Sequence, residues 1–150
     1  MRIQKAVVIG AGTMGGGIAA LIAGAGIPVT LLDIPAPEGA DRNAIVKSLW
    51  ERQVKASPAA LFTPDVAKRV TIGNTEDNFD AVRDADWIVE VIIEQLAPKQ
   101  ALMARIDAAR KPGSIVSSNT SGIPIHQIGE GRSADFRAHF LGTHFFNPPR

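Results

Sequence analysis

Residues 4–33 read QKAVVIGAGTMGGGIAALIAGAGIPVTLLD, and this stretch decides the fold class. An apolar run at residues 6–9 predicts a strand, and the small residues at 14–25 predict a helix soon after it. Between them, three glycines keep the spacing G-x-G-x-x-G, at Gly10, Gly12 and Gly15. A second apolar strand then ends in Asp33. Strand, glycine turn, helix and an acidic residue at the next strand end together predict a dinucleotide-binding unit.

Each glycine of this turn has a distinct expected task. Gly10 allows the tight turn out of the strand, Gly12 leaves space for a pyrophosphate, and Gly15 lets the helix pack close to the strand. Thr13 and Met14 lie in the same turn, where free N–H groups and a partial positive charge favour phosphates. We therefore expect all five residues to line the cofactor site. The alternative is a glycine-rich turn that binds no ligand.

Asp33 indicates which dinucleotide is bound. Its carboxylate can accept hydrogen bonds from the adenosine ribose hydroxyls, and its charge would repel a 2′-phosphate. The next residue is Ile34 rather than an arginine, which could have paired with that phosphate. We therefore expect NAD rather than NADP as the cofactor.

The composition is that of an ordinary globular domain, with 150 residues, 45% apolar and 21% charged. The net charge of +1 gives no electrostatic reason to propose a nucleic-acid partner. The chain has no cysteine, which excludes disulfides, thiolate metal sites and cysteine nucleophiles, and no metal site is predicted. No apolar run reaches the roughly eighteen residues of a membrane span, and the first strand begins too near Met1 for a signal peptide. A cytoplasmic location is the default expectation.

Strand and helix signals alternate along the whole chain. Strands are expected at residues 5–10, 28–33, 70–73, 87–93, 114–117 and 140–145. Later helices are expected at residues 41–56, 63–68, 77–83, 99–110 and 124–130. This alternation predicts one α/β domain over residues 1–150, a Rossmann-type doubly wound fold with a mostly parallel sheet. The apolar run at 87–93 should be central, and a ligand should lie beyond the carboxyl ends of the strands.

The segment between the second and third strands, residues 34–70, is longer than a normal crossover and predicts a helical insertion. One interpretation is a decorated crossover that only packs on the sheet. The other is a helical excursion that shapes a substrate site. The sequence pattern does not separate the two.

Three further motifs lie at expected strand ends. Val-Glu-x-x-x-Glu spans residues 89–94, Ser-Asn-Thr-Ser spans 118–121, and His-Phe-Phe-Asn-Pro spans 144–148. With the glycine fingerprint and the insertion, they make the whole chain resemble the NAD-binding domain of 3-hydroxyacyl-CoA dehydrogenases. The resemblance extends to the branch with bifunctional fatty-acid oxidation proteins, in which an enoyl-CoA hydratase domain can share the chain.

This resemblance implies roles for individual residues. His144 corresponds to the catalytic base, and Ser121 to a serine that touches both substrate and cofactor. Asn147 would lie beside the nicotinamide, while Glu94 and Lys99 would line the cofactor cleft. The family also uses a glutamate that orients the histidine and an asparagine from a helical domain, both expected beyond residue 150. The chain alone is therefore expected to be inactive, and the complete protein to be a homo-oligomer.

The residue types suit the oxidation of a secondary alcohol, in which NAD takes the hydride and a base takes the hydroxyl proton. A neutral imidazole is a workable base at neutral pH, and Ser121 could hold the substrate oxygen. The leading hypothesis is an NAD-dependent (S)-3-hydroxyacyl-CoA dehydrogenase of β-oxidation, acting on acyl-CoA substrates. The alternatives are a dehydrogenase of another small hydroxy acid and a non-catalytic NAD-binding module.

Structural interpretations of the same side chains stay open beside the functional ones. Ser121 could cap a turn, Glu94 could cap the helix that follows it, and Lys99 could be a solvated helix charge. His126 and His139 lack any motif context and are expected to be surface or packing residues.

Overall fold

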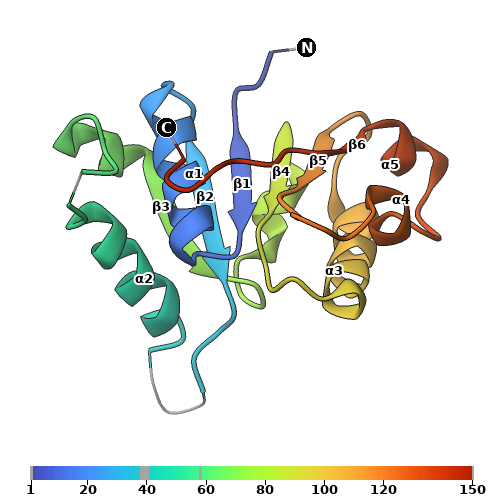
Figure 1. The fold of residues 1–150 in the computed structure, drawn as a ribbon, viewed down its shortest axis with the longest axis horizontal. Helices are drawn as coiled ribbons and strands as arrows, with labels where there is room; N and C mark the ends of the chain where they lie inside the picture. Colours follow the sequence, from blue (N-terminus) through green and yellow to red (C-terminus); the bar gives the residue numbers. More distant parts are fainter. Residues whose placement is uncertain (1, 38–40, 58, 150) are drawn as a thin grey trace.

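The computed structural model describes residues 2–37, 41–57 and 59–149, which form one sheet with helices on both faces (Figure 1). The strands are β1 (Ala6–Ile9), β2 (Val29–Asp33), β3 (Val70–Asn74), β4 (Trp87–Glu90), β5 (Ile115–Ser118) and β6 (Phe140–Gly142). The helices are α1 (Thr13–Gly24), α2 (Ala44–Val54), α3 (Leu96–Ala109), α4 (Ile125–Ile128) and α5 (Ala134–Ala138). Two short 3₁₀ helices are η1 (Pro64–Arg69) and η2 (Phe79–Arg83).

All five strand pairs are parallel, in the order β3-β2-β1-β4-β5-β6, so the predicted doubly wound sheet is confirmed. The order reverses between β1 and β4, which is the switch point of the fold. Ile9 lies level with Leu32 on one side and with Glu90 on the other, and Glu90 lies level with Ser118. The carboxyl ends of four strands therefore meet along one edge, where parallel sheets place their ligands.

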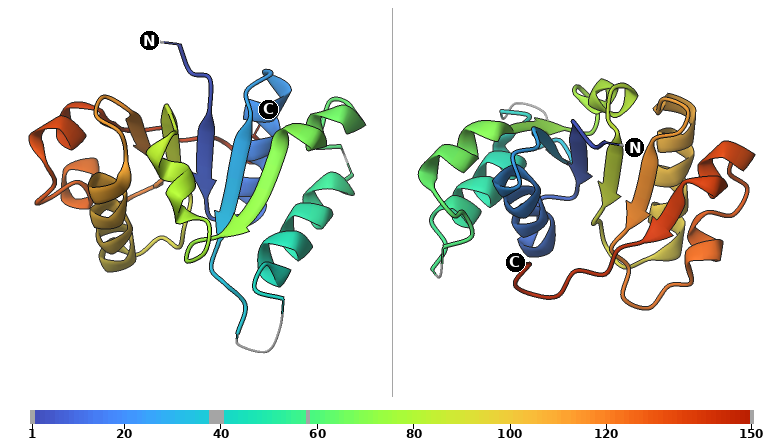
Figure 2. Two further views of the ribbon diagram at one scale, coloured as in Figure 1. Left: turned by 180° about the vertical axis from the view of Figure 1, so that it is seen from behind. Right: turned by 90° about the horizontal axis from the view of Figure 1, so that it is seen from above.

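Helices cover both faces of the sheet, as the views from behind and from above show (Figure 2). An apolar cluster packs against each face. One cluster joins the sheet to α1, α2 and η1 through residues such as Ile18, Val46 and Val66. The other joins it to α3, α4 and α5 through residues such as Met103, Ile128 and Phe136. Successive residues of β1 alternate between the clusters, because neighbouring side chains of a strand point to opposite faces.

The central strand was predicted over residues 87–93, but β4 ends at Glu90. Val91 still donates its N–H to the Ile9 carbonyl, at 2.8 Å. The Ile92 N–H instead bonds the side-chain carboxylate of Glu90, at 2.8 Å, and Ile93 is exposed. The apolar run therefore leaves the sheet early and becomes the wall of a cleft, which an apolar pattern alone does not reveal.

Helix α3 also begins earlier than predicted, at Leu96 rather than at Lys99. Pro98 occupies its third position, which is allowed because the first-turn N–H groups of a helix have no intrahelical acceptor. At the other end of the chain, β6 stops at Gly142 instead of extending to residue 145. There the Phe145 N–H is bound by the side chain of Asn119, at 2.8 Å, and not by a strand.

Helix α5 was not predicted, and the segments at 63–68 and 77–83 are 3₁₀ helices rather than α-helices. Ser133 caps α5 by accepting a hydrogen bond from the Phe136 N–H, and Phe136 fills the core. The insertion holds α2, which packs on the sheet through Val46 and Trp50. None of the helices within the described ranges has the length and apolar character needed to cross a membrane.

Candidate functional site

The glycine turn lies where β1 passes into α1, beside the end of β4. Gly10 has φ +105°, a conformation that side chains rarely adopt, and a Cβ there would lie 2.3 Å from the Val91 carbonyl oxygen. A Cβ on Gly15 would lie 1.7 Å from the Gly10 carbonyl oxygen. Both residues must therefore be glycine for the strand and the helix to approach this closely.

Gly12 differs from its two neighbours in the motif. Its backbone is ordinary, with φ −58° and ψ −174°, and a Cβ built on it would meet no atom within 4 Å. Nothing inside the described protein requires glycine at this position. The open space lies at the N-terminus of α1, whose first-turn N–H groups are free to bind an anion. A pyrophosphate of a dinucleotide fits at this position.

Asp33 ends β2 beside this turn. Its Oδ2 accepts a hydrogen bond from the Ala11 N–H, at 2.6 Å, and its Oδ1 accepts one from the Ile34 N–H, at 2.7 Å. Each carboxylate oxygen can accept a second hydrogen bond. The carboxylate is thus fixed in place with capacity left for the hydroxyls of a ribose.

Two adjoining cavities share Gly12 and Leu49 in their walls. The larger, about 430 Å³, is lined by Asp33 and by apolar side chains of the β4–α3 connection, including Ile92 and Ile93. An apolar slot with one carboxylate suits an adenosine.

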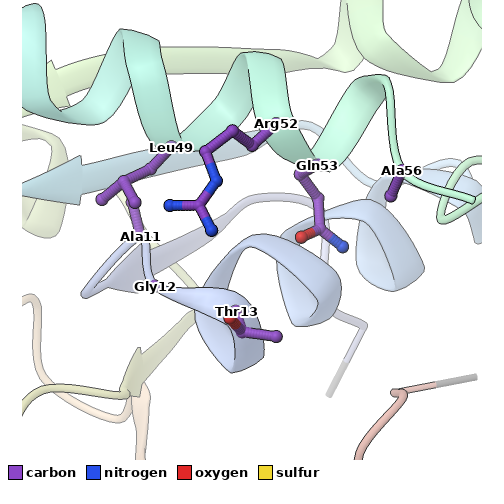
Figure 3. A pocket seen from close by; sticks show the side chains of 7 residues that line it. All are labelled: Ala11, Gly12, Thr13, Leu49, Arg52, Gln53 and Ala56. Carbon is purple, nitrogen blue, oxygen red and sulfur yellow. The ribbon is translucent and has the colours of Figure 1, made fainter.

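The smaller cavity, about 200 Å³, lies between α2 and the start of α1 (Figure 3). The Arg52 guanidinium is turned toward Ala11 and Gly12 in Figure 3, so it places a positive charge beside the anion-binding turn. Gln53 packs on the glycines of α1, since a Cβ on Gly16 would lie 3.3 Å from its Cγ. Sequence reasoning missed Arg52, because its contribution depends on how α2 crosses α1. The insertion therefore both packs on the sheet and borders the glycine turn.

Ser121 and His144 meet beyond the ends of β5 and β6. The Ser121 Oγ and the His144 Nε2 are 3.1 Å apart, and both side chains belong to exposed residues. Asn119 fixes the backbone next to the imidazole by accepting from the Phe145 N–H. The Ser118 carbonyl accepts from the Thr143 N–H, at 3.0 Å. The fold thus brings together the two residues that the motifs singled out for catalysis.

Glu94 contacts the loop that carries Ser121 and does not cap α3, whose N-cap residue is Gln95. Its Oε1 accepts hydrogen bonds from the Thr120 hydroxyl and from the N–H groups of Ser121, at 2.9 Å, and Gly122, at 3.2 Å. Partial burial opposes its ionisation, but these hydrogen bonds and the charge of Lys99 outweigh burial and lower the pKa of Glu94 to about 2. Glu94 is therefore an ionised anchor for the loop that carries Ser121.

Lys99 is 1% exposed, so it is not a solvated helix charge. Its Nζ lies 2.6 Å from Glu90 Oε1 and 3.4 Å from Glu94 Oε2. In this position the ammonium group lies between the carboxylates of Glu90 and Glu94, removed from solvent. Glu90 itself is completely buried at the end of β4, and sequence reasoning assigned it no role.

The remaining candidate residues lie around these features. Thr13 begins α1, Met14 is half-buried beside it, and Asn147 is exposed in the segment after His144. His126 is exposed on α4, and His139 Nδ1 lies 2.8 Å from the Asp135 carbonyl, as expected for a surface and a packing residue. Over the described part of the chain, no group of three or more His, Asp or Glu side chains is placed to hold a metal ion.

Sequence comparison decides the family. The profile described as "3-hydroxyacyl-CoA dehydrogenase, NAD binding domain" matches residues 5–150. The chain belongs to this family. The cofactor of this domain is NAD, as the glycine turn and Asp33 predicted.

Relatives of this NAD-binding domain carry consistent names. A protein of Deinococcus radiodurans, named "Probable 3-hydroxyacyl-CoA dehydrogenase", is 51% identical over 150 residues, which are 100% of this chain and 43% of that protein. A fatty acid oxidation complex subunit alpha of Shewanella putrefaciens is 34% identical over 98% of this chain and 20% of its own. The crystal structure of a 3-hydroxybutyryl-CoA dehydrogenase from Escherichia coli superposes with a TM-score of 0.75 at 30% identity, over 99% of this chain and 31% of that chain. The chain thus spans less than half the length of each of these relatives.

Proposed function

We propose that this domain is the cofactor half of an (S)-3-hydroxyacyl-CoA dehydrogenase, which oxidises 3-hydroxyacyl-CoA to 3-ketoacyl-CoA in fatty-acid β-oxidation. The observation that carries the proposal is the glycine turn, where a Cβ on Gly12 would meet no protein atom, at the same sheet edge as the Ser121–His144 contact. The first is suited to a dinucleotide, and the second to proton transfer. The names of the relatives supply the substrate class.

The cofactor would be held by the turn at residues 10–15, with Asp33 on the adenosine ribose and Arg52 near the phosphates. Glu94 and Asn147 are assigned to the nicotinamide side, and Lys99 acts there through Glu94. When bound, NAD supplies the acceptor for the hydride that leaves the substrate carbon.

His144 is assigned the proton transfer. When its ring proton is on Nδ1, its Nε2 is an acceptor and can take the proton of the substrate hydroxyl. Ser121 is 3.1 Å from that nitrogen and can hold the substrate oxygen next to it. The backbone contacts of Asn119 and Glu94 keep the two side chains at this distance.

The partners are also proposals. We assign an acyl-CoA as substrate, a cytoplasmic location, and a homo-oligomeric complete protein. The Phe146 ring, whose centroid lies 5.2 Å from that of His144, is 78% exposed, and Leu141 of β6 is 43% exposed. These exposed apolar side chains support packing against a further domain or subunit.

The proposal is tested on the protein encoded by the complete reading frame. We expect NADH-dependent reduction of acetoacetyl-CoA, little turnover with small hydroxy acids or their keto forms, and loss of turnover in His144→Ala. The 150-residue chain should bind NADH with negligible turnover, because no described residue orients the imidazole through Nδ1.

Two results would contradict the proposal. Turnover with a small hydroxy acid in place of the CoA thioester would reassign the substrate. NADH binding by a complete protein that reduces none of these compounds would identify a non-catalytic NAD-binding module.

A further inference from the structure

Glu90 joins three elements at the switch point from inside the protein. Its Oε1 accepts hydrogen bonds from Lys99 Nζ of α3, at 2.6 Å, and from the Ile92 N–H, at 2.8 Å. Its Oε2 accepts one from the Ser118 hydroxyl at the end of β5. The side chains of Glu90 and Lys99 are 0% and 1% exposed, so this ion pair is removed from water.

A buried ion pair of this kind is a weak source of stability. Removing two charges from water costs about as much as their attraction returns, and apolar replacements are often neutral or stabilising. The site also lies in a β4 run that is otherwise apolar, where a hydrophobic side chain would pack as well. The pair therefore calls for an explanation other than stability.

The contacts of Lys99 lead from the buried pair to the surface. Its Nζ lies 3.4 Å from Oε2 of Glu94, whose other oxygen holds the N–H groups of Ser121 and Gly122. Ser121 in turn contacts His144. A second route runs through Ser118, whose hydroxyl oxygen accepts from the Thr120 N–H at 3.3 Å. Both routes end on the loop of residues 120–122.

We propose that Glu90 and Lys99 are a positioning pair: they fix Glu94 and the loop of residues 120–122, and through that loop the distance between Ser121 and His144. Neither side chain is exposed enough to touch substrate. The inference rests on the proposed function only in that it takes Ser121 and His144 as the reacting pair. Its structural content, the control of the loop by a buried pair, is independent of the substrate.

The test uses three variants of the 150-residue chain: Glu90→Gln, Lys99→Met and the double variant. Lys99→Met leaves the buried Glu90 carboxylate without its cation, and Glu90→Gln leaves the Lys99 ammonium with only its longer contact to Glu94. Each single variant should therefore lower the urea midpoint of unfolding. The double variant leaves neither charge in the interior and should recover most of that stability. Glutamine keeps the shape of Glu90, so its contacts to Ile92 and Ser118 can persist.

The deciding measurement is the NMR signal of two amides, Ser121 and Gly122. Their proton shifts should change in the double variant, and their exchange with water should become about tenfold faster, because Glu94 loses its contact with Lys99 and holds the two N–H groups less firmly. A role in stability alone would leave both quantities at their wild-type values once stability is recovered.

Arg110→Met provides the matched control. Arg110 is 3% exposed and pairs with Asp135 near the amino-terminal end of β5, at the opposite edge of the sheet. It should lower stability without changing the Ser121 and Gly122 amides. Wild-type shifts and exchange in the double variant would overturn the proposal, and so would the same acceleration in Arg110→Met.

NADH titration of the same samples separates this inference from the proposed function. A wild-type chain that binds no NADH would contradict the function and leave the amide result to decide the positioning role. If the single variants do not fold, the amide measurements on the double variant and on Arg110→Met still test the positioning role of Glu90 and Lys99.

Discussion

The substitution Gly12→Ala should lower the affinity for NADH while leaving the stability of the fold nearly unchanged. The residue has φ −58°, and a Cβ there meets nothing within 4 Å. Alanine at a helix N-cap costs about 0.5–1 kcal/mol relative to glycine, while the stiffer unfolded chain returns about 0.4–1 kcal/mol. The two effects nearly cancel, so the free energy of unfolding should change by less than about 1 kcal/mol.

NADH binding should respond differently to the same methyl group. Gly12 lines both cavities, so its new Cβ should displace the pyrophosphate from the N–H groups of α1. One hydrogen bond to a charged group contributes about 1.5–3 kcal/mol, so the dissociation constant should rise about 10- to 100-fold. Gly12→Val, with its larger side chain, should abolish binding.

Fluorescence titration with NADH and urea unfolding of the same samples measure the two effects. Gly15→Ala is the matched control, because its Cβ would lie 1.7 Å from the Gly10 carbonyl oxygen and must strain the backbone. It should lose about 1–3 kcal/mol of stability through overpacking. An affinity of Gly12→Ala within about twofold of wild type, less than about 0.5 kcal/mol, would refute the placement of the pyrophosphate.

Five further substitutions test the rest of the site. By calorimetry the chain should bind NAD more tightly than NADP. Asp33→Ala should weaken NAD binding about tenfold or more and reduce the ratio of the NAD and NADP affinities. Equal affinities for NAD and NADP in the wild type would show that Asp33 does not select the cofactor. In the complete protein, steady-state kinetics should show a fall in kcat of about 100-fold or more for His144→Ala and about tenfold or less for Ser121→Ala. Unchanged turnover in His144→Ala would exclude it as the base. Because the folded-state pKa of Glu94 is lowered from 4.5 to about 2, its ionised form stabilises the fold above pH 4.5, and this contribution is lost as the pH falls toward 2. Urea midpoints of wild type and Glu94→Gln should therefore differ at about pH 6 and converge toward about pH 2, and a pH-independent difference would contradict this. Arg52→Ala should weaken NADH binding about tenfold at low salt and less at high salt, because the contact is a screened charge pair at the surface; no change at low salt would place its guanidinium away from the phosphates.

The sequence predicted the parts of the site that depend on local geometry. Gly10 and Gly15 are needed wherever a strand turns sharply into a close-packed helix, so their spacing alone indicates the turn. The contact between Ser121 and His144 was accessible only through the family resemblance. Their separation of 23 residues reveals nothing about distance, which depends on the pairing of β5 with β6.

Other features depend on tertiary packing and were missed. The Phe145 N–H bonds Asn119 rather than a strand, so β6 is shorter than its apolar pattern. Glu90 had a usable signal: a single acid inside an apolar central strand must find a buried partner. That signal did not identify Lys99, nine residues later, because the partner depends on where α3 begins.

Strand β1 links the thermal unfolding of the dinucleotide cavity to that of the Ser121–His144 contact. Ala6 and Val8 belong to one apolar cluster, and Val7 and Ile9 belong to the other. If either cluster is lost, one side of β1 is exposed to water. The strand is then less stable, and the other cluster packs on the same strand. We therefore expect the two faces to unfold in a single cooperative transition. On global unfolding the dinucleotide cavity and the serine–histidine contact, although built on different strands, should therefore be lost together.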